Sequence, residues 1–174
     1  MKLKLDLHTH CYEATRYAAP TVDLVREILE AAKSKGLDGI GITEHWDKEY
    51  GFRVKEIVET CFDNQLLIIP GHELDVGDQQ IVELFLPNDS VFRFLAHPGY
   101  PSEHAHVEEK LNLQGIEIEN SMHSWHINKE VVRELAEKHD LMLLRNSDAH
   151  YLSRIGQAYN EISLEDLYAR AKPA

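Results

Sequence analysis

Short apolar runs alternate along the chain with segments of helical periodicity. After Thr21, a residue type favoured at a helix N-cap, apolar residues recur at helical spacing until Gly36, which predicts a helix. Further helices are predicted over residues 54–62, 128–138 and 164–171, and strands over residues 3–7, 38–43, 66–69, 81–86, 91–96, 115–119 and 141–144. Alternating strands and helices predict an α/β fold with a mostly parallel sheet.

Most of the predicted strands end in a histidine or a carboxylate. These residues are His8, His10, His45, Glu73, His97, Asp148 and His150. Any one of them, taken alone, is more readily interpreted as a hydrogen-bonded core or loop residue. That interpretation does not explain their shared placement. Because all strand carboxyl ends of a parallel barrel open on one face, where active sites are built, we expect these side chains to meet in one cleft.

The spacing within two pairs suits a metal ion. Residues two apart in a strand point to the same face, so that the imidazoles of His8 and His10 can reach one ion. Asp148 and His150 repeat this spacing with a carboxylate. His104-Ala105-His106 has the same spacing but lies in an acidic segment that we expect to be helical, and we interpret it as solvated surface.

Composition and charge narrow the classes of function. A chain of 174 residues is close to the usual size of one domain, and we expect a single domain over residues 1–174. No apolar run approaches the ~20 residues that span a bilayer, so no membrane partner is expected. Eighteen basic and 30 acidic residues give a formal charge of −12, which disfavours nucleic acid as a partner. Two cysteines without a Cys-x-x-Cys pair, and no secretory signal, favour a cytoplasmic protein.

Six short motifs, in their order along the chain, resemble those of the PHP (polymerase and histidinol phosphatase) family. They are Asp6-Leu7-His8-Thr9-His10, Ile42-Thr43-Glu44-His45, Gly71-His72-Glu73, Ala96-His97-Pro98, Glu117-Ile118-Glu119-Asn120 and Ser147-Asp148-Ala149-His150. The resemblance covers residues 5 to about 156. It implies a distorted, TIM-like (β/α)7 barrel with two or three divalent metal ions at the carboxyl ends of its strands. The chain is shorter than the ~250 residues of a typical β/α barrel, so a trimmed version with an open site is expected.

The resemblance also implies which residues hold the ions. It places His8, His10, Glu73 and Asp148 around a first ion. Glu73 would bridge to a second ion, which His97 and His123 would also hold, with His126 as the alternative to His123.

A third ion would be held by His45 and His150, but this chain departs from the family pattern beside them. Family members usually carry Asp or His five or six positions after the second histidine of the first motif. This chain has Thr15 and Arg16 there. Glu13 or Tyr12 could substitute, although their spacing does not match a simple replacement.

The resemblance and the ligand types together predict a metal-dependent phosphoesterase that hydrolyses a small phosphorylated molecule, a phosphomonoester as for histidinol-phosphate phosphatases. Ions held by Glu73 and Asp148 would share a bridging hydroxide that attacks phosphorus. Imidazole with carboxylate suits zinc, manganese or iron. Arg16 and Arg154 are candidate phosphate ligands, because guanidinium matches phosphate in bidentate geometry.

Two alternative functions stay open from the sequence. One is a phosphodiesterase or 3′-5′ exonuclease on nucleic-acid ends, and the other is a non-catalytic binding domain that its metal ions stabilise.

Two tryptophans lie next to predicted ligands: Trp46 follows His45, and Trp125 lies two residues after His123. We expect both rings to pack half-buried rather than to line the site.

Overall fold

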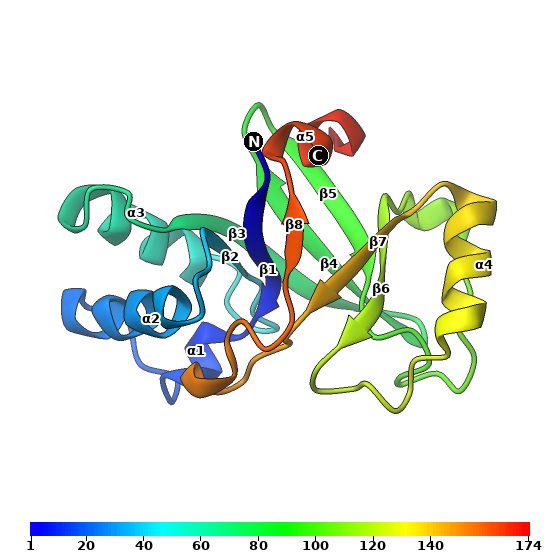
Figure 1. Cartoon of the computed structure of the whole chain (residues 1–174), viewed down its shortest axis with the longest axis horizontal. Coiled ribbons are helices and arrows are strands. Elements are labelled where there is room, and N and C mark those ends of the chain that lie inside the picture. Colours follow the sequence, from blue (N-terminus) through cyan, green and yellow to red (C-terminus); the bar gives the residue numbers. More distant parts are fainter.

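The computed structural model describes residues 1–174 and contains one nine-stranded sheet. Its strands are β1 (Leu3–Thr9), β2 (Gly39–Ile42), β3 (Leu67–Val76), β4 (Gln79–Leu86), β5 (Ser90–Leu95), β6 (Gly115–Asn120), β7 (Met142–Asn146), β8 (Asn160–Ile162) and β9 (Lys172–Pro173). The order β7-β6-β5-β4-β3-β2-β1-β8 curls into a nearly closed eight-stranded barrel, and β9 pairs with β5 (Figure 1). The predicted TIM-like barrel is thus confirmed.

A side chain joins the two strands at the open seam of the barrel, β7 and β8. The amide nitrogen of Asn160 in β8 donates to the carbonyl oxygen of Arg145 in β7 at 2.8 Å and to that of Leu5 in β1 at 3.1 Å. Its oxygen accepts from the backbone N–H of Arg145 at 2.8 Å. The side chain of the buried Asn160 therefore satisfies backbone groups of β7 and β1 that no paired strand satisfies at this seam.

The sheet is mixed, so the prediction of a mostly parallel sheet is wrong. β1–β2–β3 and β5–β6–β7 pair in parallel, whereas β3–β4, β4–β5 and β1–β8 pair in antiparallel fashion. The cause lies in two short turns. Only Gly77 and Asp78 join β3 to β4, with Gly77 at φ 65°, and three residues join β4 to β5. Connections this short allow a hairpin but no crossover helix.

The antiparallel pairing also lengthens β3 beyond its predicted end. The strand runs seven residues beyond Ile69, to Val76, because residues 71–76 pair with β4. The prediction placed Glu73 at a strand end, whereas in the structure it lies inside β3. The other predicted strands lie within about two residues of the observed ones, and α1, β8 and β9 were not predicted.

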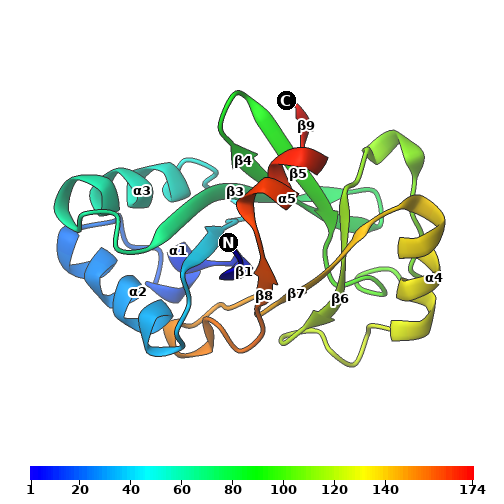
Figure 2. The same ribbon diagram turned by 45° about the horizontal axis from the view of Figure 1, so that its top comes forward.

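The helices are α1 (Cys11–Ala14), α2 (Val22–Ser34), α3 (Tyr50–Cys61), α4 (Lys129–His139) and α5 (Leu164–Arg170), with 3-10 turns at Glu109–Leu111 and Leu152–Arg154. α2 and α3 lie side by side against one flank of the barrel, and α4 covers the flank formed by β6 and β7 (Figures 1 and 2). The N-cap predicted at Thr21 is confirmed, and Asn128 caps α4 in the same way, since both side chains accept backbone N–H groups. No helix is long and apolar enough to cross a membrane.

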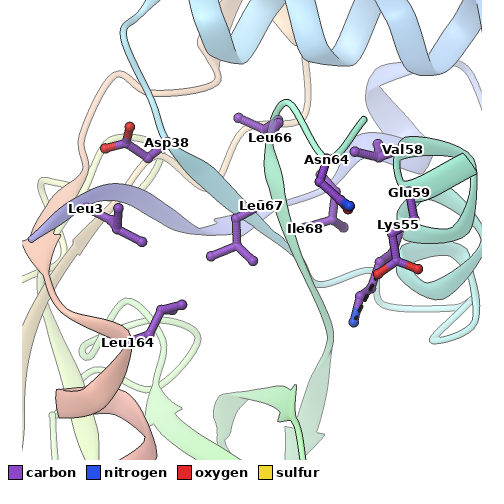
Figure 3. Close-up of a pocket in the computed structure, with 10 residues that line it drawn as sticks. All are labelled: Leu3, Asp38, Lys55, Val58, Glu59, Asn64, Leu66, Leu67, Ile68 and Leu164. Atoms are coloured by element: carbon purple, nitrogen blue, oxygen red, sulfur yellow. Dashed lines mark ion pairs between the residues drawn. The ribbon is translucent and has the colours of Figure 1, made fainter. Parts of the chain in front are cut away.

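One cavity of about 420 Å³ lies at the amino ends of the parallel strands, among Leu3 of β1, Asp38 before β2 and Leu67 of β3 (Figure 3). Lys55 and Glu59 of α3 form an ion pair at its edge. None of the predicted site residues lines it. They gather instead toward the carboxyl ends of β1, β2 and β5–β7.

Candidate metal centre

The histidine pair of the first motif sits at the end of β1, where backbone bonds hold the loop after β7 against it. His8 lies in β1 and His10 directly after it, and both are fully buried. The N–H of Asp148 donates to the carbonyl oxygen of His8 at 2.9 Å, and the N–H of His10 donates to that of Ala149 at 2.9 Å. This exchange brings the carboxylate of Asp148 over the same face as the two imidazoles.

Four buried side chains converge there with one donor atom each. They are His8, His10, Glu73 and Asp148. His8 Nε2 lies 3.2 Å from both His10 Nε2 and Glu73 Oε2. His10 Nε2 lies 3.2 Å from Glu73 Oε2 and 3.1 Å from Asp148 Oδ1, and the separation from His8 Nε2 to that oxygen is 3.5 Å.

These separations fit a divalent cation. Ligands about 2.0–2.1 Å from an ion in tetrahedral geometry stand about 3.3 Å from one another. Asp148 Oδ1 is buried without a hydrogen-bond partner, which costs free energy unless an ion or a proton satisfies it. We refer to these four residues as the first group.

A second group adjoins the first and shares its carboxylates. It comprises His97, His123 and Asp148. His97 Nε2 lies 3.0 Å from Glu73 Oε1, and His123 Nε2 lies 3.7 Å from Asp148 Oδ2. Glu73 and Asp148 therefore each present one oxygen to each group, whereas the sequence implied a bridging position for Glu73 alone. His126 belongs to neither group, so the geometry favours His123 over His126.

A third group consists of His10, His45 and His150. The ring of His10 stacks between the other two, with centroid distances of 4.5 Å to His45 and 4.2 Å to His150. His45 and His150 are partly exposed, unlike the members of the first group, so the third group lies at the mouth of the centre.

A buried carboxylate beneath the groups, Glu117 of β6, was missed as a functional residue. Its Oε1 accepts from His8 Nδ1 at 2.9 Å and from Asn146 Nδ2 at 2.8 Å. Its Oε2 accepts from the N–H of His97 and from Asn120 Nδ2, each at 2.8 Å. Such carboxylates fix the tautomer and orientation of a ligating histidine. The signal in the sequence was a glutamate between isoleucines on a buried strand, Gly115-Ile116-Glu117-Ile118.

Asn120, at the end of β6, links the two carboxylates to the loop that carries His123. Its Nδ2 donates to Glu117 and, at 3.2 Å, to Asp148 Oδ2. Its Oδ1 accepts the N–H groups of Met122 and His123, each at 2.9 Å. The motif ending in Asn120 therefore positions ligands rather than supplying one.

The electrostatics of the first group follow from burying opposite charges together. Burial lowers the pKa of His10, but the carboxylates of Asp148 and Glu73, 3.1 and 3.2 Å from its Nε2, outweigh this effect and raise the pKa to about 9. The pKa of His8 is raised in the same way. Conversely, burial would raise the pKa of Glu73 and Asp148, but the neighbouring histidines hold both well below the usual range. Metal ions and protons therefore compete for the same atoms.

The backbone is strained at two of these residues. His97 has φ 25° and Asp148 has φ 53°, values that residues other than glycine rarely adopt. Strained residues of this kind persist where the surroundings hold them, and they cluster at functional sites.

The two predicted phosphate ligands do not join the groups. Arg16 is exposed and lines a separate hollow of about 490 Å³ with Glu27 and Tyr151. Arg154, in the 3-10 turn after β7, is exposed and donates to Gln157 Oε1 at 3.2 Å. Neither guanidinium hydrogen-bonds or pairs with a residue of the three groups, and the role of both as phosphate ligands stays a prediction.

Two further expectations are corrected. Trp46 is 80% and Trp125 is 74% exposed, so neither packs half-buried as predicted. Each ring lies 6.2 Å from a histidine of the centre, His45 and His123 respectively, because both follow their histidine into an open loop. His104-Ala105-His106 is surface as predicted, but it is not helical.

Comparison with known proteins places these observations in a family. The PHP domain profile matches residues 6–172, nearly the whole chain. No curated protein sequence matches the chain.

Solved structures share the fold at low sequence identity. A proposed metal-dependent phosphoesterase from Bifidobacterium adolescentis superposes with a TM-score of 0.66 at 12% identity, over 95% of this chain and 96% of that chain. PsfC from Pseudomonas syringae gives 0.64 at 17% identity, over 89% and 79%. An amidohydrolase from Chromobacterium violaceum, determined with bound sulfate and no metal, gives 0.62 at 13% identity, over 97% of both chains.

Proposed function

The chain belongs to the PHP domain family of metal-dependent hydrolases, and on that premise we propose that it hydrolyses a small phosphomonoester. The observation that carries the proposal is the pair of adjoining groups that share Glu73 and Asp148. A carboxylate that offers one oxygen to each of two adjoining groups can bridge two neighbouring ions.

The residues present fit divalent cations, and zinc, manganese or iron suits their mixture of imidazole and carboxylate. The first group would hold one ion, and His97 and His123 would hold a second together with the shared carboxylates. Ions bound there would lower the pKa of water toward neutrality and offset charge on the phosphoryl oxygens.

The chain's own contribution is to orient the ligating rings through their second nitrogen. Glu117 accepts a hydrogen bond from Nδ1–H of His8, and Nε2 of that ring then faces the ion. Tyr100 does the same for His97, since its carbonyl oxygen accepts from Nδ1 at 3.1 Å. Burial and the neighbouring His97 lower the pKa of His123 to about 4, so this ring stays neutral at physiological pH.

The surroundings of the centre favour a small substrate. The net charge of −12 opposes approach of a long polyanion such as nucleic acid. A phosphate monoester can place its phosphoryl group between the groups while its alcohol stays near solvent.

Hydrolysis assays on protein loaded with Mn²⁺ or Zn²⁺ test this proposal. We expect release of phosphate from p-nitrophenyl phosphate, and weaker or no cleavage of bis(p-nitrophenyl) phosphate and of a single-stranded oligonucleotide. Asp148→Asn should lower turnover at least about 100-fold while the protein stays folded, and the surface variant Asp23→Asn is the matched control. Preferential cleavage of the oligonucleotide would replace this function with an exonuclease. No hydrolysis by fully loaded protein would favour a binding domain.

A further inference from the structure

His123, in the second group, is held differently from three other histidines of the centre. Nδ1 of His8, His97 and His150 lies within 3.1 Å of a hydrogen-bond acceptor, which orients each ring. Nδ1 of His123 is buried and has no hydrogen-bond partner. Asn120 fixes only the backbone of His123, whose N–H it accepts at 2.9 Å. The orientation of the His123 ring therefore depends on packing.

Four aromatic rings surround the imidazole of His123, and the ring of Tyr100 is the nearest. The centroids of these two rings lie 4.4 Å apart, with their planes 18° from parallel. The rings of His97, His126 and Trp125 lie 4.6, 5.7 and 6.2 Å away and are tilted by 42–48°. Tyr100 therefore provides the stacked contact that defines the plane of the imidazole.

Tyr100 is itself anchored to His97, the other histidine of the second group. Its N–H donates to the carbonyl oxygen of His97 at 3.1 Å, and its own carbonyl oxygen accepts from His97 Nδ1 at 3.1 Å. Gly99, with φ 102°, lets this loop approach the loop after β6, since a side chain at position 99 would overlap the carbonyl oxygen of His126. Tyr100 thus joins the loop that carries His97 to the loop that carries His123.

We propose that Tyr100 is a positioning residue for the second group: its backbone orients His97, and its ring holds His123 by stacking in place of a hydrogen bond. This inference rests on the metal dependence in the proposed function. Stacking fixes the plane of an imidazole but does not select which nitrogen carries the proton, whereas a hydrogen bond does both. We therefore expect the ion of the second group to bind more weakly than the ion of the first group, where Glu117 bonds to His8.

Titration of the full-length apoprotein with Mn²⁺, with free Mn²⁺ followed by electron paramagnetic resonance, tests this role without any substrate. His123→Ala identifies the ion of the second group as the one that it weakens most. Tyr100→Ala should weaken the same ion about 10-fold and leave the tight ion nearly unchanged. Tyr100→Phe, which keeps the ring, should bind as the wild type does.

The matched control is Tyr168→Ala in α5, because 44% of Tyr168 and 40% of Tyr100 is exposed. Both alanine variants should fold, which circular dichroism checks, and Tyr168→Ala should bind both ions with wild-type affinity.

Long-range ¹H–¹⁵N NMR spectra of the zinc-loaded protein report the rings directly, since metal binding and the tautomer shift the signals of imidazole nitrogens. Tyr100→Ala should change the nitrogen signals of His123 and leave those of His8 in place.

Unchanged affinity for the second ion in Tyr100→Ala, or an equal loss in Tyr100→Phe, would overturn the role of the ring. An equal loss of both ions in Tyr100→Ala would reveal a general structural effect and would overturn it too, as would a wild type that binds no second ion. A protein whose second ion depends on Tyr100 but which hydrolyses no phosphate ester would uphold the inference and remove the proposed function, so the two failures are distinguishable.

Discussion

Glu117 accepts a hydrogen bond from Nδ1 of His8 at 2.9 Å, with both side chains fully buried beneath the metal centre. The same carboxylate fixes the backbone of His97 and the amide of Asn120. One residue that is no ligand itself thus orients His8 in β1 and His97 after β5, and it holds Asn120, which positions the loop of His123.

Replacing Glu117 with Gln should weaken binding of the first ion by about 10- to 100-fold. The amide NH₂ group cannot accept the hydrogen bonds that one carboxylate oxygen now accepts, so the tautomer of His8 with its proton on Nδ1 is no longer favoured. Zinc affinity measured by competition with a chelating dye checks this. Glu119→Gln is the matched control, since Glu119 lies two residues further on the same strand and pairs with Lys129 and Arg145 at the surface. Equal zinc affinities in the two variants would remove the orienting role of Glu117.

Asp6 holds the loop that carries Asp148 and His150. Its carboxylate accepts from the N–H and the hydroxyl of Ser147 and from the N–H of Gly156 at 2.8 Å, and it is fully buried. Asp6→Asn leaves at least one of these donors without an acceptor, and we expect a loss of about 1–3 kcal/mol in the free energy of unfolding. Urea denaturation measures it.

The exposed Asp23, paired with Arg26, serves as control for Asp6, and Asp23→Asn should change stability by less than about 0.5 kcal/mol. If Asp6→Asn unfolds at the same urea concentration as Asp23→Asn, the loop is not held in this way.

The stability of the metal-free protein should fall as the pH rises from about 6.5 to 9. The pKa of His10 in the folded protein is about 9 against 6.5 for an unperturbed histidine, so protonated His10 stabilises the fold below pH 6.5 and this contribution is lost through pH 9. Burial raises the pKa of Glu44 from 4.5 to about 7, so its proton also stabilises the fold, and this contribution is lost mainly between pH 4.5 and 7. The lowered pKa values of Glu73 and Asp148 act oppositely and remove stability only in acid.

Bound ions should reverse this slope, because they displace protons from the same imidazoles and bind more tightly as the pH rises. Melting temperatures between pH 6 and 9, with a chelator and with excess Mn²⁺, measure both slopes. In the metal-free protein, His10→Gln should flatten the dependence of melting temperature on pH. A metal-free wild type whose melting temperature rises between pH 6 and 9 would contradict the protonated state of His10.

Much of the centre could be predicted because its residues obey local rules. His8 and His10 are two apart at the end of β1, and this spacing turns both rings to one side. Asp148 and His150 repeat the spacing in the loop after β7, where backbone bonds to His8 and His10 hold the loop in place. Glu73 was predicted although its strand end was misplaced, since its motif marked it independently of the strand boundary.

The remaining features depend on contacts between distant segments. The role of Glu117 arises from the side chains of His8 in β1 and Asn146 in β7 and from the backbone N–H of His97 after β5, none of which its own strand reveals. The position of Arg16 depends on its left-handed backbone, and the exposure of Trp46 and Trp125 on loops without periodicity. The antiparallel course of β3–β5 was readable in the two short turns but was outweighed by the alternation of strands and helices elsewhere.

The central claim is that these histidines and carboxylates form a centre for more than one divalent ion. Elemental analysis of the purified protein, repeated after loading with zinc, manganese and iron in turn, tests it most directly. We predict two or three ions per chain, reduced in Asp148→Asn. A protein that holds no ion after loading with each metal would contradict the centre and the hydrolytic function proposed from it.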